Sequence, residues 1–165
     1  MKLKALVLAL AMAAAGPLAA QDLVLGLTHA KTGRYAGVGI GTEVAVDIAV
    51  AEINAAGGVN GKKLRIEKFD TGSEAKNAQI AAQKFTQDAR ALGIIGPFSS
   101  QEAQVAFAAG ERLEIVQIPN AASAPGLTKD RNWAFRITED EGKQFGRLLK
   151  TLESKGGFTA KSAAV

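Results

Sequence analysis

Two neighbouring hydroxyl groups lie where a short apolar run passes into an alanine-rich stretch. Residues 96 to 103 read GPFSSQEA, which places Ser99 and Ser100 at the expected start of a helix. A serine at this position can cap the helix by accepting an amide proton of the first turn. One cap needs only one serine, and the free amides of a helix start also bind anions at the positive end of the helix dipole. We therefore expect the pair to hold a carboxylate.

A second loop, PNAASAPGLT at residues 119 to 128, is rich in small residues and hydroxyl groups. It can be an ordinary surface turn stiffened by Pro119 and Pro125. It can also form a wall beside the serine pair, where Ser123 offers a hydroxyl and Ala121 offers a carbonyl to an ammonium group. In that case the two loops would together capture a small zwitterion.

Catalytic machinery is hard to assemble from the other residues. His29 is the sole imidazole, and no serine lies in the G-x-S-x-G pattern of a nucleophile elbow. A hydrolase that used Ser99 or Ser100 as its nucleophile would depend on His29 and an unidentified acid. We expect His29 to pack or to form a hydrogen bond at a strand end, and we expect no enzymatic activity.

Metal and cofactor sites are also not indicated. The sequence has no cysteine, which excludes thiolate chemistry and cysteine-based metal sites. Acidic residues such as Asp70, Glu102 and Glu111 lack the spacing of a cation site and are expected on solvated faces or as caps. Gly37, Gly39 and a glycine at position 41 miss the dinucleotide fingerprint, because position 42 is threonine. They predict a mobile glycine loop that lines a cleft.

Short apolar runs alternate with longer stretches of helical period along the chain. Ser73 is a candidate N-cap for the second helix. Such alternation predicts a doubly wound α/β fold, a mainly parallel sheet flanked by helices, with ligands near the carboxyl ends of the strands. The strands are expected at 23–28, 63–70, 92–96 and 114–119, with an extended stretch at 133–138, and the helices at 43–58, 73–91, 99–113 and 139–155.

The first twenty residues differ in composition from the rest. Two lysines precede an uncharged apolar run from 6 to 15, and a Gly-Pro pair and small residues follow. This order is typical of a secretory signal peptide over 1–20, with cleavage after Ala20. Its removal would leave 18 of the 20 basic residues against 16 acidic ones, scattered along the chain. No nucleic-acid partner is therefore expected.

Several blocks resemble, in order and spacing, the periplasmic leucine/isoleucine/valine-binding proteins, the type I substrate-binding proteins that serve ABC importers. The blocks read TGRYAGVG, AVAEINAAGGVNGKKLRIEKFDT, IIGPFSSQEA, IPNAASAPGLT and WAFRIT. The resemblance implies a ligand cleft between two lobes and a permease partner in the inner membrane. It implies that 21–165 forms the first, incomplete lobe, without the second lobe that supplies the acidic partner of the ligand ammonium.

The resemblance also assigns roles to individual positions. Ser100 matches the serine that holds the ligand carboxylate, and Ser123 matches the serine or threonine that contacts both charged groups. Ala121 matches the position whose carbonyl accepts from the ammonium. The family's first-loop tyrosine, which packs on the ligand side chain, has no counterpart at Val38, and Tyr35 is a candidate substitute. The stretch that lines the pocket corresponds to Pro97, Phe98 and Ser99.

Three functions follow from these patterns. The first is a periplasmic component of an ABC importer that binds a branched-chain amino acid or a related small polar ligand, without a cofactor. The second is an extracellular sensor domain with the same fold. The third is an exported enzyme that uses one hydroxyl of the pair as its nucleophile.

Overall fold

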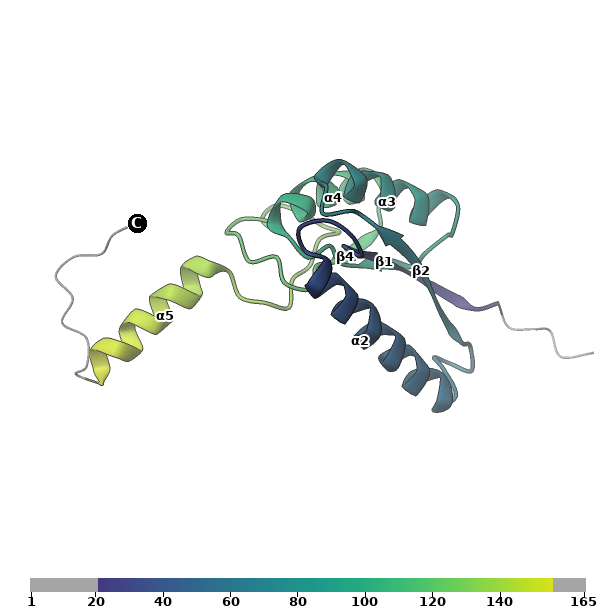
Figure 1. Ribbon diagram of the computed structural model, residues 1–165, viewed down its shortest axis with the longest axis horizontal. Helices are drawn as coiled ribbons and strands as arrows, with labels where there is room; N and C mark the ends of the chain where they lie inside the picture. Colours follow the sequence, from purple (N-terminus) through teal and green to yellow (C-terminus); the bar gives the residue numbers. More distant parts are fainter. Residues whose placement is uncertain (1–20, 156–165) are drawn as a thin grey trace, which may run out of the picture.

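The computed structural model describes residues 21–155, in which four strands and four helices alternate (Figure 1). The signal peptide predicted at 1–20 lies outside these residues. The strands are β1 (Leu23–His29), β2 (Leu64–Asp70), β3 (Gly93–Ile95) and β4 (Val116–Ile118), and the helices are α2 (Ala36–Ala55), α3 (Ala75–Gln87), α4 (Ser100–Leu113) and α5 (Glu141–Ser154).

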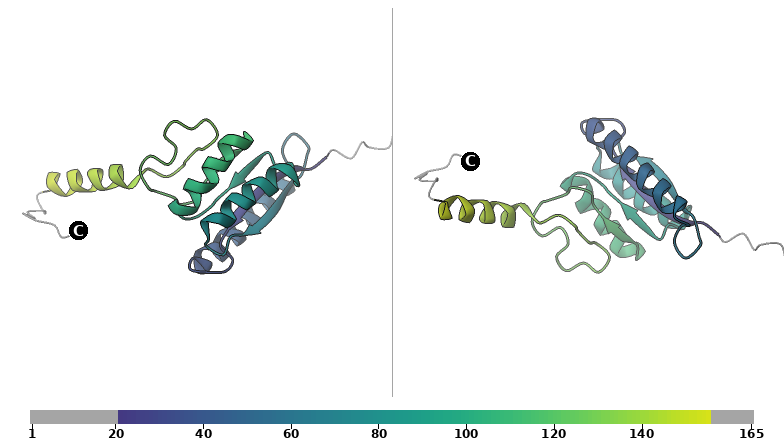
Figure 2. Two further views of the ribbon diagram at one scale, coloured as in Figure 1. Left: turned by 90° about the horizontal axis from the view of Figure 1, so that it is seen from above. Right: turned by 90° about the horizontal axis from the view of Figure 1, so that it is seen from below.

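The four strands form one parallel sheet in the order β2-β1-β3-β4. The chain steps outward from β1 to β2 and then crosses back over β1 to reach β3. Because crossovers between parallel strands are right-handed, steps in opposite directions place their helices on opposite faces of the sheet. Helix α2 accordingly lies on one face, and α3 and α4 lie side by side on the other (Figures 1 and 2). The predicted doubly wound fold is confirmed.

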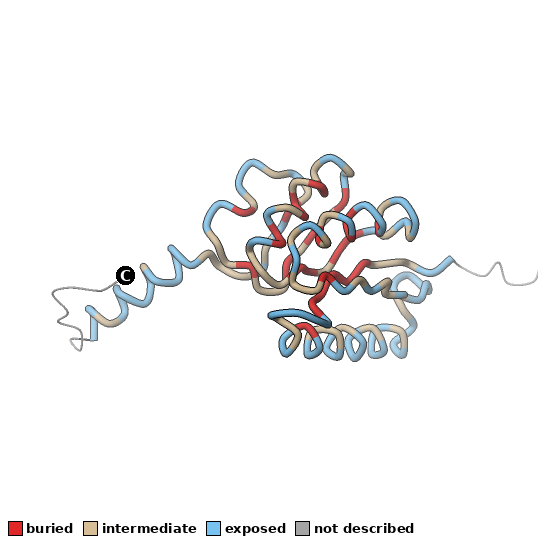
Figure 3. Tube along the Cα trace, turned by 45° about the horizontal axis from the view of Figure 1, so that its top comes forward, coloured by how far each residue is buried: buried red, intermediate tan, exposed pale blue. Residues whose placement is uncertain are grey.

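The hydrophobic core lies between the sheet and the helix pair α3–α4. Phe85 of α3 and Phe107 of α4 are both 1% exposed, and alanines fill the space between the helices. Figure 3 shows the buried residues concentrated on this side of the sheet. Small residues let the two helices approach each other closely, so two phenylalanines suffice to fill the layer.

Gly26, in the middle of β1, lies directly beneath the Phe85 ring. A Cβ atom at position 26 would fall 2.4 Å from the ring carbon Cδ2 of Phe85. No side chain fits at that distance, because carbon atoms in contact are normally about 3.5 to 4 Å apart. The absence of a side chain at Gly26 therefore allows α3 to pack onto the strand.

Helix α2 begins seven residues earlier than the sequence pattern indicates, and this corrects the prediction of a mobile glycine loop. Gly37, Gly39 and the glycine at 41 lie inside its first two turns. A Cβ atom on Gly39 would lie 1.9 Å from the Ala30 carbonyl oxygen, so this glycine permits the helix to cross the end of β1. The glycines therefore set a close helix-strand contact.

Ser73 does not cap α3, which corrects a second prediction. The N-cap of α3 is Glu74, with no side-chain cap bond, and Ser73 has a positive φ of 67°. Its hydroxyl instead accepts a hydrogen bond from the Tyr35 amide at 3.0 Å. A contact distant in sequence has replaced the local cap.

Residues 133–138 are extended, as predicted, and run beside β4. The Gln117 amide donates to the Trp133 carbonyl at 2.8 Å, and the Phe135 amide donates to the Gln117 carbonyl at 2.9 Å. This single parallel bridge occupies part of the outer edge of β4.

Helix α5 stands apart from the layered part of the molecule (Figures 1 and 2). None of its residues is buried, and Phe145, Leu148 and Leu149 are exposed on one side. Their spacing gives the apolar stripe of a helix that packs against another element. Among residues 21–155, no helix combines the length and the apolar content needed to cross a membrane.

Candidate ligand site at the carboxyl edge of the sheet

A hollow of about 430 Å³ lies where the loops after β1, β3 and β4 meet. The strand order reverses between β1 and β3, and the carboxyl ends of the strands beside such a switch point are where open α/β sheets bind ligands. The carboxyl-edge hollow is lined by Arg34, Tyr35, Phe98, Ser99, Ser100, Gln101, Ala121, Ala122, Ser123 and Glu141. Six of the eight predicted site residues are among them.

The other two predicted residues lie elsewhere. Val38 lines an adjoining apolar groove of about 440 Å³ between α2 and the sheet, which shares Phe98 and Ala121 with the carboxyl-edge hollow. Pro97 is fully buried and lines neither space. The structure thus brings the predicted hydroxyls together and places Pro97 in a supporting position.

Ser99 is the helix cap of the serine pair. Its Oγ accepts from the Glu102 amide at 3.3 Å and donates to the Glu102 carboxylate at 2.6 Å. The Ser99 amide also donates to that carboxylate at 3.3 Å, which completes a capping box at the start of α4. Both functions of this hydroxyl are therefore used within the protein.

Glu102 is buried, so of the two expected roles, a solvated face or a cap, it has the second, as a member of the capping box. Only 1% of it is exposed, and its second carboxylate oxygen accepts from the Thr71 hydroxyl at 2.6 Å. Burial of a carboxylate is costly unless hydrogen bonds compensate for the lost water, and here two hydroxyls and one amide supply them. Glu102 therefore ties the loop after β2 to the start of α4.

The loop after β2 is tied in turn to the loop after β1. The Thr71 hydroxyl accepts from the Ser73 amide at 3.2 Å, and the Ser73 hydroxyl accepts from the Tyr35 amide at 3.0 Å. The Asp70 carboxylate accepts from the amides of Lys31 and Thr32 at 2.8 and 3.2 Å. These bonds fix three of the loops at the carboxyl edge relative to one another.

The pKa of Asp70 reflects this bonding. Burial raises the pKa of the carboxyl group, but the bonds it accepts from the Gly72 amide and from the Thr32 hydroxyl and amide outweigh burial. The net result is a pKa below the usual range. Glu111, on α4, similarly accepts from the amides of Trp133 and Asn132, and these bonds lower its pKa. Both acids act as caps for loops, as the sequence suggested.

Ser100 differs from its neighbour because its proton is free. Its Oγ accepts from the Ala124 amide at 3.2 Å, which leaves the hydroxyl hydrogen available to the carboxyl-edge hollow. Within residues 21–155, the backbone amides of Ser100 and Gln101 have no acceptor. One hydroxyl and two amides at the positive end of α4 therefore form a set of donors for an anion.

Ser123 has the opposite bonding pattern. Its Oγ donates to the Glu141 carboxylate at 2.6 Å, and the Glu141 amide donates to the Ser123 carbonyl at 3.0 Å. The start of α5 is thereby attached to the loop after β4. No local pattern of residues indicates this contact, because the two residues are 18 positions apart.

Two aromatic rings line the carboxyl-edge hollow, and one of them, Phe98, also lines the apolar groove. The Tyr35 and Phe98 ring centroids are 5.2 Å apart, and the Arg34 guanidinium carbon lies 5.3 Å from the Tyr35 ring centroid. Such pairs favour tilted packing and cation-π attraction. Arg34 is a lining residue that sequence reasoning missed, because exposed arginines in loops carry no distinctive pattern.

His29 is engaged away from the serine pair. It is 3% exposed, and its Nε2 lies 3.0 Å from the Glu43 carboxylate of α2. The Lys68 ammonium, hydrogen-bonded to Glu43 at 3.1 Å, lowers the pKa of that carboxyl group, and the contact with His29 acts in the same direction. The imidazole thus binds α2 to the strand end, as the sequence led us to expect.

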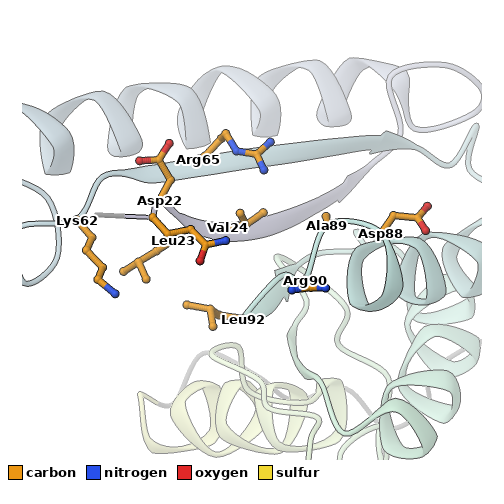
Figure 4. A pocket seen from close by; sticks show the side chains of 10 residues that line it. Asp22, Leu23, Val24, Lys62, Arg65, Asp88, Ala89, Arg90 and Leu92 are labelled. Carbon is orange, nitrogen blue, oxygen red and sulfur yellow. The ribbon is translucent and has the colours of Figure 1, made fainter. Parts of the chain in front are cut away.

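The opposite edge of the sheet also carries a hollow, of about 620 Å³, which Figure 4 shows from close by. The charged side chains around it come from the amino ends of strands and from exposed turns: Asp22, Lys62, Arg65, Asp88 and Arg90. The amino ends of parallel strands are not where such sheets bind ligands. The carboxyl-edge hollow is therefore the stronger candidate.

Comparison with known proteins agrees with this geometry. Residues 22–165 match the model of a family described as periplasmic binding protein. The chain belongs to this family. A Leu/Ile/Val-binding protein of Escherichia coli K12 is 36% identical over 109 residues, which cover 66% of this chain and 29% of that protein. A Leu/Ile/Val-binding protein of Citrobacter freundii is 34% identical over 137 residues, 82% of this chain and 37% of that protein.

Solved structures of periplasmic binding proteins superpose on the chain. The branched-chain amino acid transporter substrate-binding protein of Streptococcus pneumoniae, in complex with isoleucine, gives a TM-score of 0.71 at 27% identity. The match covers 73% of this chain and 34% of that one. The sequence therefore spans about a third of the length of the relatives that it matches, and the predicted resemblance to this family is confirmed.

Proposed function

We propose that the protein containing this chain binds a small solute through its carboxylate in the carboxyl-edge hollow, without chemical turnover. The single observation that carries this proposal is the free donor set at the start of α4. The Ser100 hydroxyl and the amides of Ser100 and Gln101 lack acceptors within the described part of the chain. Ser99 caps the same helix, so the donor set remains available for a ligand.

An amino acid with an apolar side chain is the proposed ligand class. The charged groups of the hollow adjoin an apolar groove lined by Val38, Phe98 and Ala121, which would accept such a side chain. The isoleucine complex of the Streptococcus pneumoniae relative supports this class. Within it, a branched-chain amino acid is our first choice.

We further propose that the protein works in the periplasm as the binding component of an ABC importer. The signal peptide predicted at 1–20 and the membership of the family support export. The relatives extend well beyond this chain, and we propose that their remaining length corresponds here to a second lobe. The exposed stripe of Phe145, Leu148 and Leu149 on α5 would pack in that lobe, and closure of the two lobes would signal to the permease.

Calorimetric titration of the complete gene product against amino acids, amides and small organic acids tests the proposal. We expect heat of binding from branched-chain amino acids. Ser100→Ala should lower the affinity roughly 10-fold or more, because a hydrogen bond to a charged group is lost. Ser154→Ala, at the far end of α5, is the matched control and should bind like the natural protein. No binding across the panel, or equal affinity for Ser100→Ala, would contradict the proposal.

A further inference from the structure

We propose that the amino terminus of the exported protein is a modification site, at which Gln21 closes into a pyroglutamate ring. The inference rests on the export proposed above and goes beyond the binding of a solute. Cleavage after Ala20, which the signal-peptide pattern predicts, makes Gln21 the first residue of the exported protein. The new α-amine and the side-chain amide of Gln21 then have the spacing that closes a lactam ring.

The structure leaves Gln21 free to close this ring. Gln21 and Asp22 are exposed, and β1 begins with the bond that the Leu23 amide donates to the Lys63 carbonyl at 2.8 Å. Within residues 21–155, the backbone of Gln21 has no hydrogen-bond partner. Ring closure therefore breaks no backbone hydrogen bond of the sheet.

Cationic side chains surround the terminus. The parallel register pairs Leu23 with Leu64, which places Gln21 beside Lys62 at the amino edge of the sheet. Lys62 and Arg90 both line the hollow at this edge (Figure 4), and so does Gln21. A nearby positive charge disfavours a second one, so these side chains favour the unprotonated form of the terminal amine.

The other charged residues of this hollow do not cancel the effect. Arg65 forms an ion pair with Glu67, and Asp88 forms one with Lys84 at 3.4 Å. Asp22 is the remaining acid that lines the hollow, and it faces two cations that form no ion pair within the described residues. The local charge around the terminus is therefore net positive.

The reaction needs no co-reactant. The unprotonated α-amine nitrogen attacks the side-chain carbonyl carbon Cδ of Gln21. A bond forms between this nitrogen and Cδ, the bond from Cδ to Nε2 breaks, and Nε2 leaves as ammonia with a proton from the amine. Both groups belong to one residue, so the step has the high effective concentration of an intramolecular reaction. The product is a neutral lactam, which removes one positive charge from beside Lys62.

The test follows the terminus of the complete gene product after export. The folded protein is incubated in mildly alkaline buffer, acidified and digested, and the peptide of residues 21–31 is analysed by mass spectrometry. We expect this peptide to lose the mass of one ammonia and its reactive amine. Gln21→Asn is the matched control, because its shorter side chain could close only a strained four-membered ring, so its peptide should keep both. Lys62→Gln should slow ring closure roughly 2-fold, because one neighbouring charge is lost.

Each alternative outcome removes a different step. A Gln21 amine that persists through the incubation would overturn the inference, and so would an exported protein that begins at another residue. Equal rates for Lys62→Gln and the natural protein would overturn the role of the neighbouring cations. In all three cases the proposed export and solute binding would stand. An uncleaved chain that is not exported would instead overturn the proposed periplasmic function, and the inference with it.

Discussion

The two faces of the sheet are covered very differently. On one face, α3 and α4 bury Phe85, Phe107 and a set of alanines almost completely. On the other, α2 lies over β1 and β2 but leaves Val44 and Ile48 more than half exposed. Apolar content therefore does not by itself bury a helix, because α2 is rich in apolar residues but, within residues 21–155, packs only against β1 and β2.

The largest difference between the faces should appear in stability. Phe85→Ala removes a ring that is 1% exposed and should lower the free energy of unfolding by about 3 to 5 kcal/mol, through lost burial and an unfilled cavity. Ile48→Ala, at 55% exposure on α2, should cost less than about 1 kcal/mol. Urea unfolding of both variants of the complete gene product measures the two values, and equal losses would refute the distinction.

A buried acid on the covered face should matter more than an exposed acid on the open face. Glu102→Gln leaves one of two hydroxyl donors, from Thr71 or Ser99, without a charged acceptor, and should cost about 1 to 3 kcal/mol. Glu52→Gln, exposed on α2, should change the free energy of unfolding by less than about 0.5 kcal/mol. Urea midpoints compare the two, and a neutral Glu102→Gln would show that the buried network adds no stability.

The ends of the helices on the two faces should respond oppositely to glycine. Glu114, the C-cap of α4, has a φ of 54°, where glycine is unstrained, so Glu114→Gly should stabilise by about 0.5 to 1 kcal/mol. Ala56, the C-cap of α2, has a φ of −74°, and Ala56→Gly should destabilise slightly because it only adds freedom to the unfolded chain. Melting temperatures that move in the same direction would contradict this prediction.

The smallest expected effect is a dependence of stability on pH, which comes from the carboxyl group of Asp70. The folded pKa of Asp70 lies below its usual value of about 3.9, so its contribution to stability is present above that pH and is lost as the pH falls through the folded pKa. Asp70→Asn should therefore be less stable than the natural protein at pH 7, with the difference shrinking below about pH 4. Denaturant unfolding at several pH values measures the gap, and a gap that widens in acid would contradict the assignment.

The strands and most of the helices could be predicted from the sequence, because hydrophobic period and turn residues are local signals. Ser99 and Ser100 could be found for the same reason, since a helix start is visible in the sequence. The early start of α2 could not, because Gly39 is needed for a contact with Ala30 that exists only in the folded chain.

The rest of the site also depends on contacts that are distant in sequence. Glu102 is buried by Thr71, 31 positions away, and Glu141 reaches the hollow through Ser123. The spacing of Ser99 and Glu102 matches a capping box, but nothing beside Glu102 indicates its bond to Thr71, and nothing beside Glu141 distinguishes it from a solvated acid. The sequence could thus predict the hydroxyl groups and the Ala121 carbonyl of the site, whereas the contact of Glu141 with Ser123 required the structure.

The contact between Gly26 and Phe85 also restricts which substitutions can accumulate at these two positions during evolution. Any side chain at position 26 would collide with the aromatic ring, which leaves only 2.4 Å for the first added carbon. A smaller residue at position 85 would relieve the collision but would leave a void beside a bare strand. The two positions should therefore covary among homologous sequences, with a larger residue at position 26 only where Phe85 has been replaced by a smaller one.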